Sequence, residues 1–113
     1  MRCVGLLLLV LVCVTAVEAG AIGIANEGKS DYVICVSADA IAPEQTAARE
    51  LQGHLQAVTG ANLPIVAESE AAGTTRAFVV GPCERFRSAF PDVDLASLKH
   101  DGIVMKTSGD TVY

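Results

Sequence analysis

The sequence predicts an α+β domain in which a mixed β-sheet carries one main helix and one short helix in two layers. Three observations support this fold class. A helix with an apolar stripe is bracketed by Pro43 and Gly60, short β-branched runs flank it, and glycine-containing turns separate those runs. A strand, a helix and a second strand in this order favour a right-handed crossover, so we expect the two flanking strands to run parallel.

A signal peptide over residues 1–19 is expected to precede this domain. Arg2 is followed by an apolar stretch from Cys3 to Val14, interrupted only by Gly5. This stretch is shorter than the roughly 20 residues of a membrane-spanning helix and matches the roughly 7 to 15 of a signal-peptide core. We therefore expect a secreted or periplasmic product that has no membrane partner after cleavage.

Small residues mark the expected cleavage site at Val17-Glu18-Ala19, and a cut after Ala21 is the alternative. Lipidation at Cys13 is disfavoured because Val12 stands where a small residue is expected. Cleavage after Ala19 leaves residues 20–113, enough chain for one core.

Composition excludes some classes of partner and scaffold. The net charge is −5, and the leader holds one Arg and one Glu, so the remaining domain keeps that charge. No basic stripe is present, so we expect no nucleic-acid partner. Only Cys35 and Cys83 remain after cleavage, which is too few for a disulfide-dense scaffold. One bridge and two buried free thiols are both open.

Two strands are expected before the main helix. Residues 21–25 and 32–37 form apolar runs around the polar turn 26–31, a pattern typical of a hairpin. The second run is apolar on both faces, which indicates an interior strand covered on both sides.

The main helix is expected to begin at Pro43 and to end at Gly60, with Glu44 favourably placed for the helix dipole. Gly53 costs the helix about 1 kcal/mol relative to Ala, through close packing or as a tolerated weakness. The predicted apolar stripe contains Ala47, Ala48, Leu51, Leu55 and Val58, and the predicted wet face contains Arg49, Glu50, Gln52 and Gln56.

Shorter elements are expected after this helix. Residues 63–67 and 76–80 are predicted strands, and a short helix follows with Cys83, Phe86 and Phe90 on one face, ended by Pro91. The remaining predictions are a capped helical turn over 92–99 and a hairpin of 102–107 with 111–113. Because the last arm is short and leaves a poorly paired edge, we expect a fragment of a longer product.

Candidate metal ligands do not form a known motif. His54 and His100 lack a second histidine or a cysteine at ligand spacing, and His54 is expected beside Glu50 in solvent. Asp92, Asp94 and Ser97 lack the spacing of a calcium loop, so Asp94 is expected to cap a helical turn. The sequence predicts no metal and no cofactor.

Catalytic patterns are also incomplete. Glu68 and Glu70 could form the carboxylate pair of a glycosidase, but nothing near them in the sequence supplies the burial that would raise one pKa, so we expect a solvated pair. No nucleophile elbow or phosphate-binding loop is present, and no catalytic residue is predicted. Most of the few aromatic residues fall on core-facing positions, which leaves carbohydrate binding by this domain alone as a minor alternative.

The order of several segments resembles a known family: Asp31-Tyr32-Val33-Ile34, Ala47-Ala48-Arg49-Glu50-Leu51-Gln52, Thr59-Gly60-Ala61-Asn62-Leu63-Pro64-Ile65-Val66 and Val79-Val80-Gly81-Pro82. It is similar to the amino-terminal accessory domain of family 67 α-glucuronidases and related large secreted proteins. Residues 101–106 resemble the penultimate strand of that domain. The resemblance covers the chain from about Asp31 onward.

The resemblance implies a mixed sheet with helices, like the second domain of β-hexosaminidases, that packs against a catalytic barrel of the same polypeptide. It transfers no catalytic residue. The implied function is that of a non-catalytic accessory domain of a secreted glycoside hydrolase acting in polysaccharide breakdown. The alternative is a stand-alone secreted binding or interaction module. Cys35 and Cys83 depart from the family pattern, and a disulfide between them is a hypothesis that depends on their separation.

Overall fold

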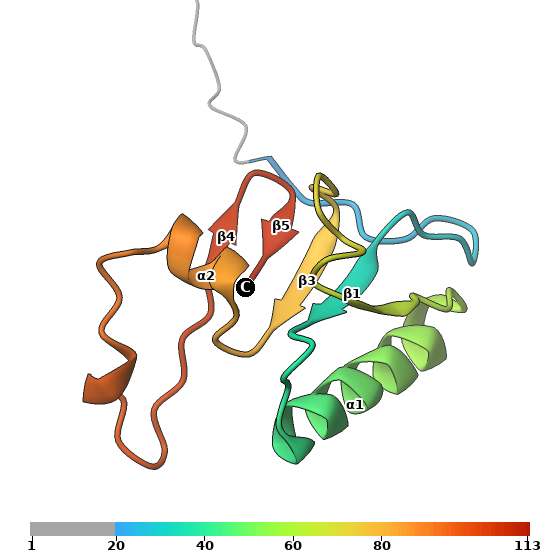
Figure 1. The fold of residues 1–113 in the computed structure, drawn as a ribbon. Helices are drawn as coiled ribbons and strands as arrows, with labels where there is room; N and C mark the ends of the chain where they lie inside the picture. The colour runs from blue at the N-terminus through green and yellow to red at the C-terminus, as the bar shows by residue number, and fades with distance from the viewer. Residues whose placement is uncertain (1–19) are drawn as a thin grey trace, which may run out of the picture.

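A five-stranded mixed sheet forms the centre of the structure, a computed structural model that describes residues 20–113 (Figure 1). The strand order is β2-β1-β3-β5-β4. Neighbouring strands run parallel from β2 to β5, and β4 is antiparallel to β5. The strands are β1 (Val33–Val36), β2 (Ile65–Ala67), β3 (Ala77–Val80), β4 (Thr107–Ser108) and β5 (Thr111–Val112). The expected signal peptide, residues 1–19, lies outside the described residues.

Helices pack on both faces of this sheet. The main helix is α1 (Ala42–Thr59), and the short helix is α2 (Glu84–Ala89), followed by a 3-10 turn, η1 (Leu95–Ser97). Ile34 belongs to the buried cluster that contains Ala48 of α1, whereas Cys35 belongs to the cluster that contains Phe86 of α2. The mixed sheet with one main and one short helix is confirmed, and the expected helical layer is divided between the two faces.

Both ends of α1 lie close to their predicted positions. At the start, the Glu44 carboxylate accepts a hydrogen bond from the Ile41 amide at 3.1 Å. At the end, Gly60 adopts a φ of 75° and donates its amide proton to the Gln56 carbonyl at 2.8 Å. Because a left-handed backbone is strained for side-chain-bearing residues, glycine at this position ends the helix at low cost.

The buried face of α1 is narrower than its apolar pattern predicts. Ala48 is fully buried, and Leu51 and Leu55 are half-buried, but Ala47 is exposed and Val58 is 84% exposed. The wet-face prediction is wrong for Gln52, whose side-chain amide donates to the Leu63 carbonyl at 2.7 Å. Short strands present a small surface, so only a thin strip of the helix is covered.

The predicted amino-terminal hairpin is wrong. Residues 21–25 form no strand, and the turn holds only an isolated bridge between Asn26 and Lys29. β1 already has parallel partners on both sides, so no ladder position is free for residues 21–25. Instead, Ile22 and Ile24 pack against the cluster on the α1 face, and the Ser30 hydroxyl donates to the Ile24 carbonyl.

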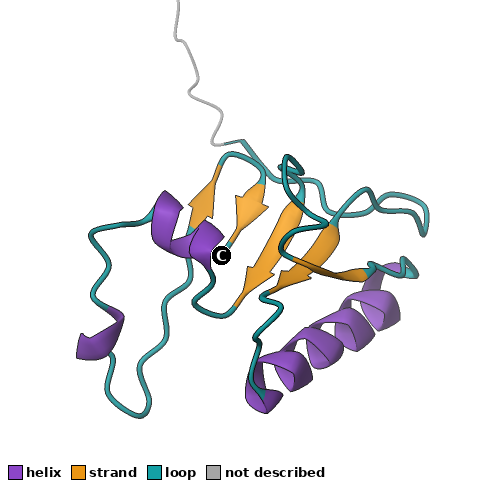
Figure 2. Ribbon diagram, viewed as in Figure 1, coloured by secondary structure: helices purple, strands orange, loops and turns teal. Residues whose placement is uncertain are grey.

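The carboxyl-terminal hairpin forms with a shorter first arm than predicted. β4 contains only Thr107 and Ser108, and two further backbone hydrogen bonds join Lys106 to Tyr113 at 2.7 and 2.8 Å. The last arm was expected at an edge, yet β5 lies between β3 and β4. A long loop containing η1 separates α2 from β4 (Figure 2).

Gly53→Ala should stabilise the domain. An added Cβ at Gly53 meets no atom within 4 Å, so Gly53 is a tolerated weakness and does not mark a close approach. The free energy of unfolding should rise by about 1 kcal/mol, equivalent to a Tm increase of about 4–8 °C in a domain of this size. Circular-dichroism melts of Gly53→Ala, with Gly60→Ala as the destabilised control, test this, and a lower Tm for Gly53→Ala would contradict it.

Candidate functional site

The acidic candidates for chemistry are held as structural caps. Glu68 accepts the backbone amide of Arg85 at 2.5 Å, and Glu70 accepts the amide of Ala67 at 3.2 Å. The prediction of a fully solvated pair is therefore wrong for Glu68, which is half-buried beneath α2, while Glu70 is exposed. Each carboxylate therefore has a structural partner of its own, and the two do not act as a pair.

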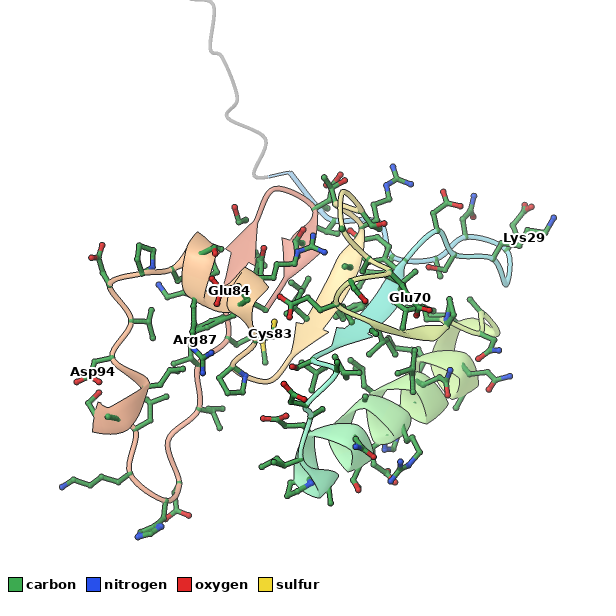
Figure 3. The ribbon with its side chains drawn as sticks, in the orientation of Figure 1. Lys29, Glu70, Cys83, Glu84, Arg87 and Asp94 are labelled. Carbon is green, nitrogen blue, oxygen red and sulfur yellow. The ribbon has the colours of Figure 1, made fainter. Side chains whose placement is uncertain are left out.

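The other polar candidates lie where the sequence predicts. The Asp94 carboxylate accepts the Ala96 amide at 3.0 Å and caps η1, which confirms the capping prediction. His54 lies 3.6 Å from Glu50 with both side chains exposed, as expected. Figure 3 shows Asp94 on the outlying loop and Cys83 next to the sheet, so these groups do not converge on one site.

Arg85 is a polar anchor that the sequence analysis did not identify. Its guanidinium donates to the carbonyls of Ala71 and Thr74 and to the Thr111 hydroxyl. Thr111 is buried, and its hydroxyl in turn donates to the Thr75 carbonyl. These bonds tie the loop after β2 to α2 and β5. No local sequence motif indicates this role. The only hint is that Arg85 lies beside an aromatic residue in a short helix.

The two cysteines are buried free thiols in one cluster on the α2 face of the sheet. Burial is the main cause that raises the pKa of Cys35, with a further increase from nearby Cys83 and a decrease from Arg85. Burial also raises the pKa of Cys83, against the opposing effect of hydrogen bonds from the Phe86 and Arg85 backbone. Both groups are therefore neutral thiols near pH 7 and poor nucleophiles.

Aromatic side chains fill the core, as the sequence predicts. Tyr32 and Phe86 are buried, and the Tyr32 hydroxyl donates to the Asp110 carbonyl at 2.8 Å. Phe90 and Tyr113 meet edge to face with 5.1 Å between ring centroids, and the Lys106 ammonium lies 5.2 Å from the Phe90 centroid. These rings therefore pack against neighbouring side chains of the same domain.

An apolar groove of about 670 Å³ is the best candidate for a binding surface. It lies between α1, the carboxyl end of β3 and the loop that precedes β4. Ile103 and Met105 on its wall are 84% and 77% exposed. Apolar side chains and glycines line it throughout, including Leu51, Phe78, Val80, Leu98, Val112 and Tyr113. Such a surface suits apolar contact with another protein segment better than polar catalysis.

A second, smaller hollow of about 350 Å³ lies over the amino-terminal turn. Its wall contains Asp31 and Arg76, which form an exposed ion pair with 3.0 Å between Oδ2 and Nη1. Since exposed ion pairs contribute little and are screened by salt, this hollow offers no assembled recognition site.

Neither a metal centre nor a membrane span is found in the part of the chain that the structure describes. Within residues 20–113, no three His, Cys, Asp or Glu side chains are grouped as metal ligands. No helix in the same range has the length and apolar character needed to cross a bilayer.

Comparisons of the chain with protein-family models, with curated proteins and with solved structures found no significant match.

Raising the pH above 9 should destabilise the reduced protein. Burial raises the pKa of Cys35 and Cys83 from an ordinary value of 9.0, so the unfolded chain loses these protons at a lower pH than the folded one. The stability contributed by the neutral thiols is therefore complete below pH 9 and is lost as the pH rises further. Denaturant unfolding of the reduced chain at pH 7 to 10 measures this loss.

The matched control is the double variant Cys35→Ala, Cys83→Ala measured across the same pH range. It should show a smaller decrease in the free energy of unfolding, leaving the contribution of Tyr32, whose pKa burial also raises. Equal decreases for both proteins would contradict the assignment to the thiols.

Proposed function

We propose that this chain forms the non-catalytic accessory domain of a secreted carbohydrate-active protein, an α-glucuronidase-like glycoside hydrolase acting in polysaccharide breakdown. Its task is to pack against a catalytic barrel of the same polypeptide and to support the approach to that barrel's active site. The sugar context comes only from the resemblance of the segments around residues 31–34, 47–52, 59–66 and 79–82.

The apolar groove is the observation that carries this proposal. Its walls contain no charged side chain, and Ile103 and Met105 expose large apolar surfaces there. Burying such surface against a neighbouring domain stabilises the pair by about 25 cal/mol per Å². The two acidic residues considered for catalysis, Glu68 and Glu70, accept hydrogen bonds from backbone amides, which supports a structural role.

Export is part of the same proposal, because the apolar segment from Cys3 to Val14 and the site at Ala19 match a signal peptide. Expression of the whole chain in a bacterium, followed by amino-terminal sequencing of the periplasmic or medium fraction, tests it. The expected first residue is Gly20, or Ile22 for the alternative cut. Recovery of the intact chain only inside the cell would contradict export.

Two experiments test the accessory-domain role. Reading the gene beyond codon 113 should show an open frame that continues into a long β/α repeat, whereas an immediate stop would favour the stand-alone secreted module. The chain by itself should hydrolyse neither 4-nitrophenyl glycosides nor glucuronoxylan oligosaccharides. Hydrolysis that persists after rigorous purification would contradict a non-catalytic domain.

Charged substitutions in the groove should remove its apolar binding capacity. Ile103→Lys and Met105→Lys should each reduce the fluorescence of the apolar dye ANS bound to the native protein. Val58→Lys is the control, because Val58 is as exposed as Ile103 but lies outside the groove. Circular dichroism checks that each variant is folded. An equal fluorescence decrease in all three variants would contradict the groove as the binding surface.

A further inference from the structure

Cys35 and Cys83 come from different elements and meet in one buried cluster. Cys35 lies in the middle of β1 and is 0% exposed, while Cys83 is the residue before α2 and is 3% exposed. Ala77, Val79 and Phe86 share this cluster. Figure 3 shows Cys83 between α2 and the sheet. The two thiols thus face the same side of the sheet, opposite α1.

Strand register explains why they come together. Cys35 of β1 pairs in register with Val79 of β3, and neighbouring strands lie roughly 4.8 Å apart. Only four positions after Val79, the chain has turned through Gly81 and reached Cys83. Gly81 has a φ of 88°, and its carbonyl accepts the Cys83 amide at 2.9 Å, so this tight turn folds Cys83 back over the sheet.

Charged groups near the sulfurs come from two other segments. Arg85 of α2 lowers the pKa of Cys35, and Glu68, directly after β2, raises the pKa of both Cys35 and Cys83. Glu68 already binds the Arg85 amide, and the Arg85 guanidinium binds backbone carbonyls and Thr111. The main hydrogen bonds of both charged side chains are therefore made to backbone and hydroxyl groups, and their side-chain hydrogen bonds to Cys35 and Cys83 are among the smaller influences on the pKa of each thiol.

We propose that Cys35 and Cys83 form an intramolecular disulfide when the chain meets a disulfide oxidant, and that this bond fastens the start of α2 to the interior strand β1. In the reaction, each thiol loses one proton and one electron. The oxidant, a small or protein disulfide, is reduced to two thiols through a mixed-disulfide intermediate. The inference goes beyond the accessory-domain function, since it involves neither a sugar nor a barrel.

The bond would close a loop of roughly 50 residues, and the entropy that a disulfide removes from the unfolded chain increases slowly with loop length. Disulfides of this loop length raise the Tm of small domains by on the order of 10 °C. In the folded state the bond would hold the start of α2, a helix of only 6 residues, against β1.

Peptide mapping after oxidative refolding decides the proposal. The full chain is reduced, denatured, refolded in a mixture of reduced and oxidised glutathione, and digested with trypsin without reduction. Trypsin cuts after Lys29, Arg49, Arg76 and Arg85, so the expected product joins residues 30–49 to residues 77–85. Free sulfhydryls at Cys35 and Cys83, a bond from either residue to Cys3 or Cys13, or a covalent dimer would each overturn it.

A stability comparison provides the second readout. Adding dithiothreitol should lower the Tm of the oxidised chain by on the order of 10 °C and should leave Cys35→Ala, Cys83→Ala unchanged. If dithiothreitol left the Tm of the oxidised wild-type chain unchanged, the proposal that the bond fastens α2 to β1 would be overturned. The peptide map uses only the wild-type chain, so it remains decisive even if the double variant fails to fold.

Discussion

The interior strand β1 is the constraint on which the rest of the structure depends. It pairs in parallel with β2 on one side and with β3 on the other, so its backbone is satisfied within the sheet. Because successive side chains alternate, Ile34 enters the cluster beneath α1 and Cys35 enters the cluster beneath α2, and both are 0% exposed. The four residues of β1 thereby contribute to both clusters, and α1 and α2 each cover one face of this strand.

Side-chain hydrogen bonds connect segments around the two apolar clusters. The two clusters are small, and the other strands of the sheet are only two to four residues long, so side-chain hydrogen bonds to backbone carbonyls join the outer segments. Arg85 connects the loop after β2 to α2 and β5, and the Tyr32 hydroxyl connects the start of β1 to the hairpin at Asp110. Removing one such donor would leave part-buried carbonyls without this partner, which weakens the connection between the segments.

Sequence reasoning succeeded where the signal is local and failed where it depends on partners. The limits of α1, the cap at Asp94 and the parallel pairing of β1 with β2 follow from proline, glycine, aspartate and crossover handedness. Residues 21–25 have a strand-like composition, yet parallel neighbours occupy both edges of β1. Gln52 and Arg85 have ordinary surface patterns, and only the tertiary fold brings backbone carbonyls within their reach.

Polar groups are dispersed over this fold, whereas apolar side chains line one groove. Carboxylates that could have served chemistry satisfy backbone amides, and the aromatic rings are packed against one another. α1 contacts β1, β2 and β3, but the groove beside it extends to Val112 of β5 and Met105 with no charged wall. Surface of this kind is more favourable when shielded from water, so association through the groove has a physical driving force that the dispersed polar groups lack. Phe86 of α2 and Leu51 of α1 both line the groove, so the two helices jointly shape its apolar wall.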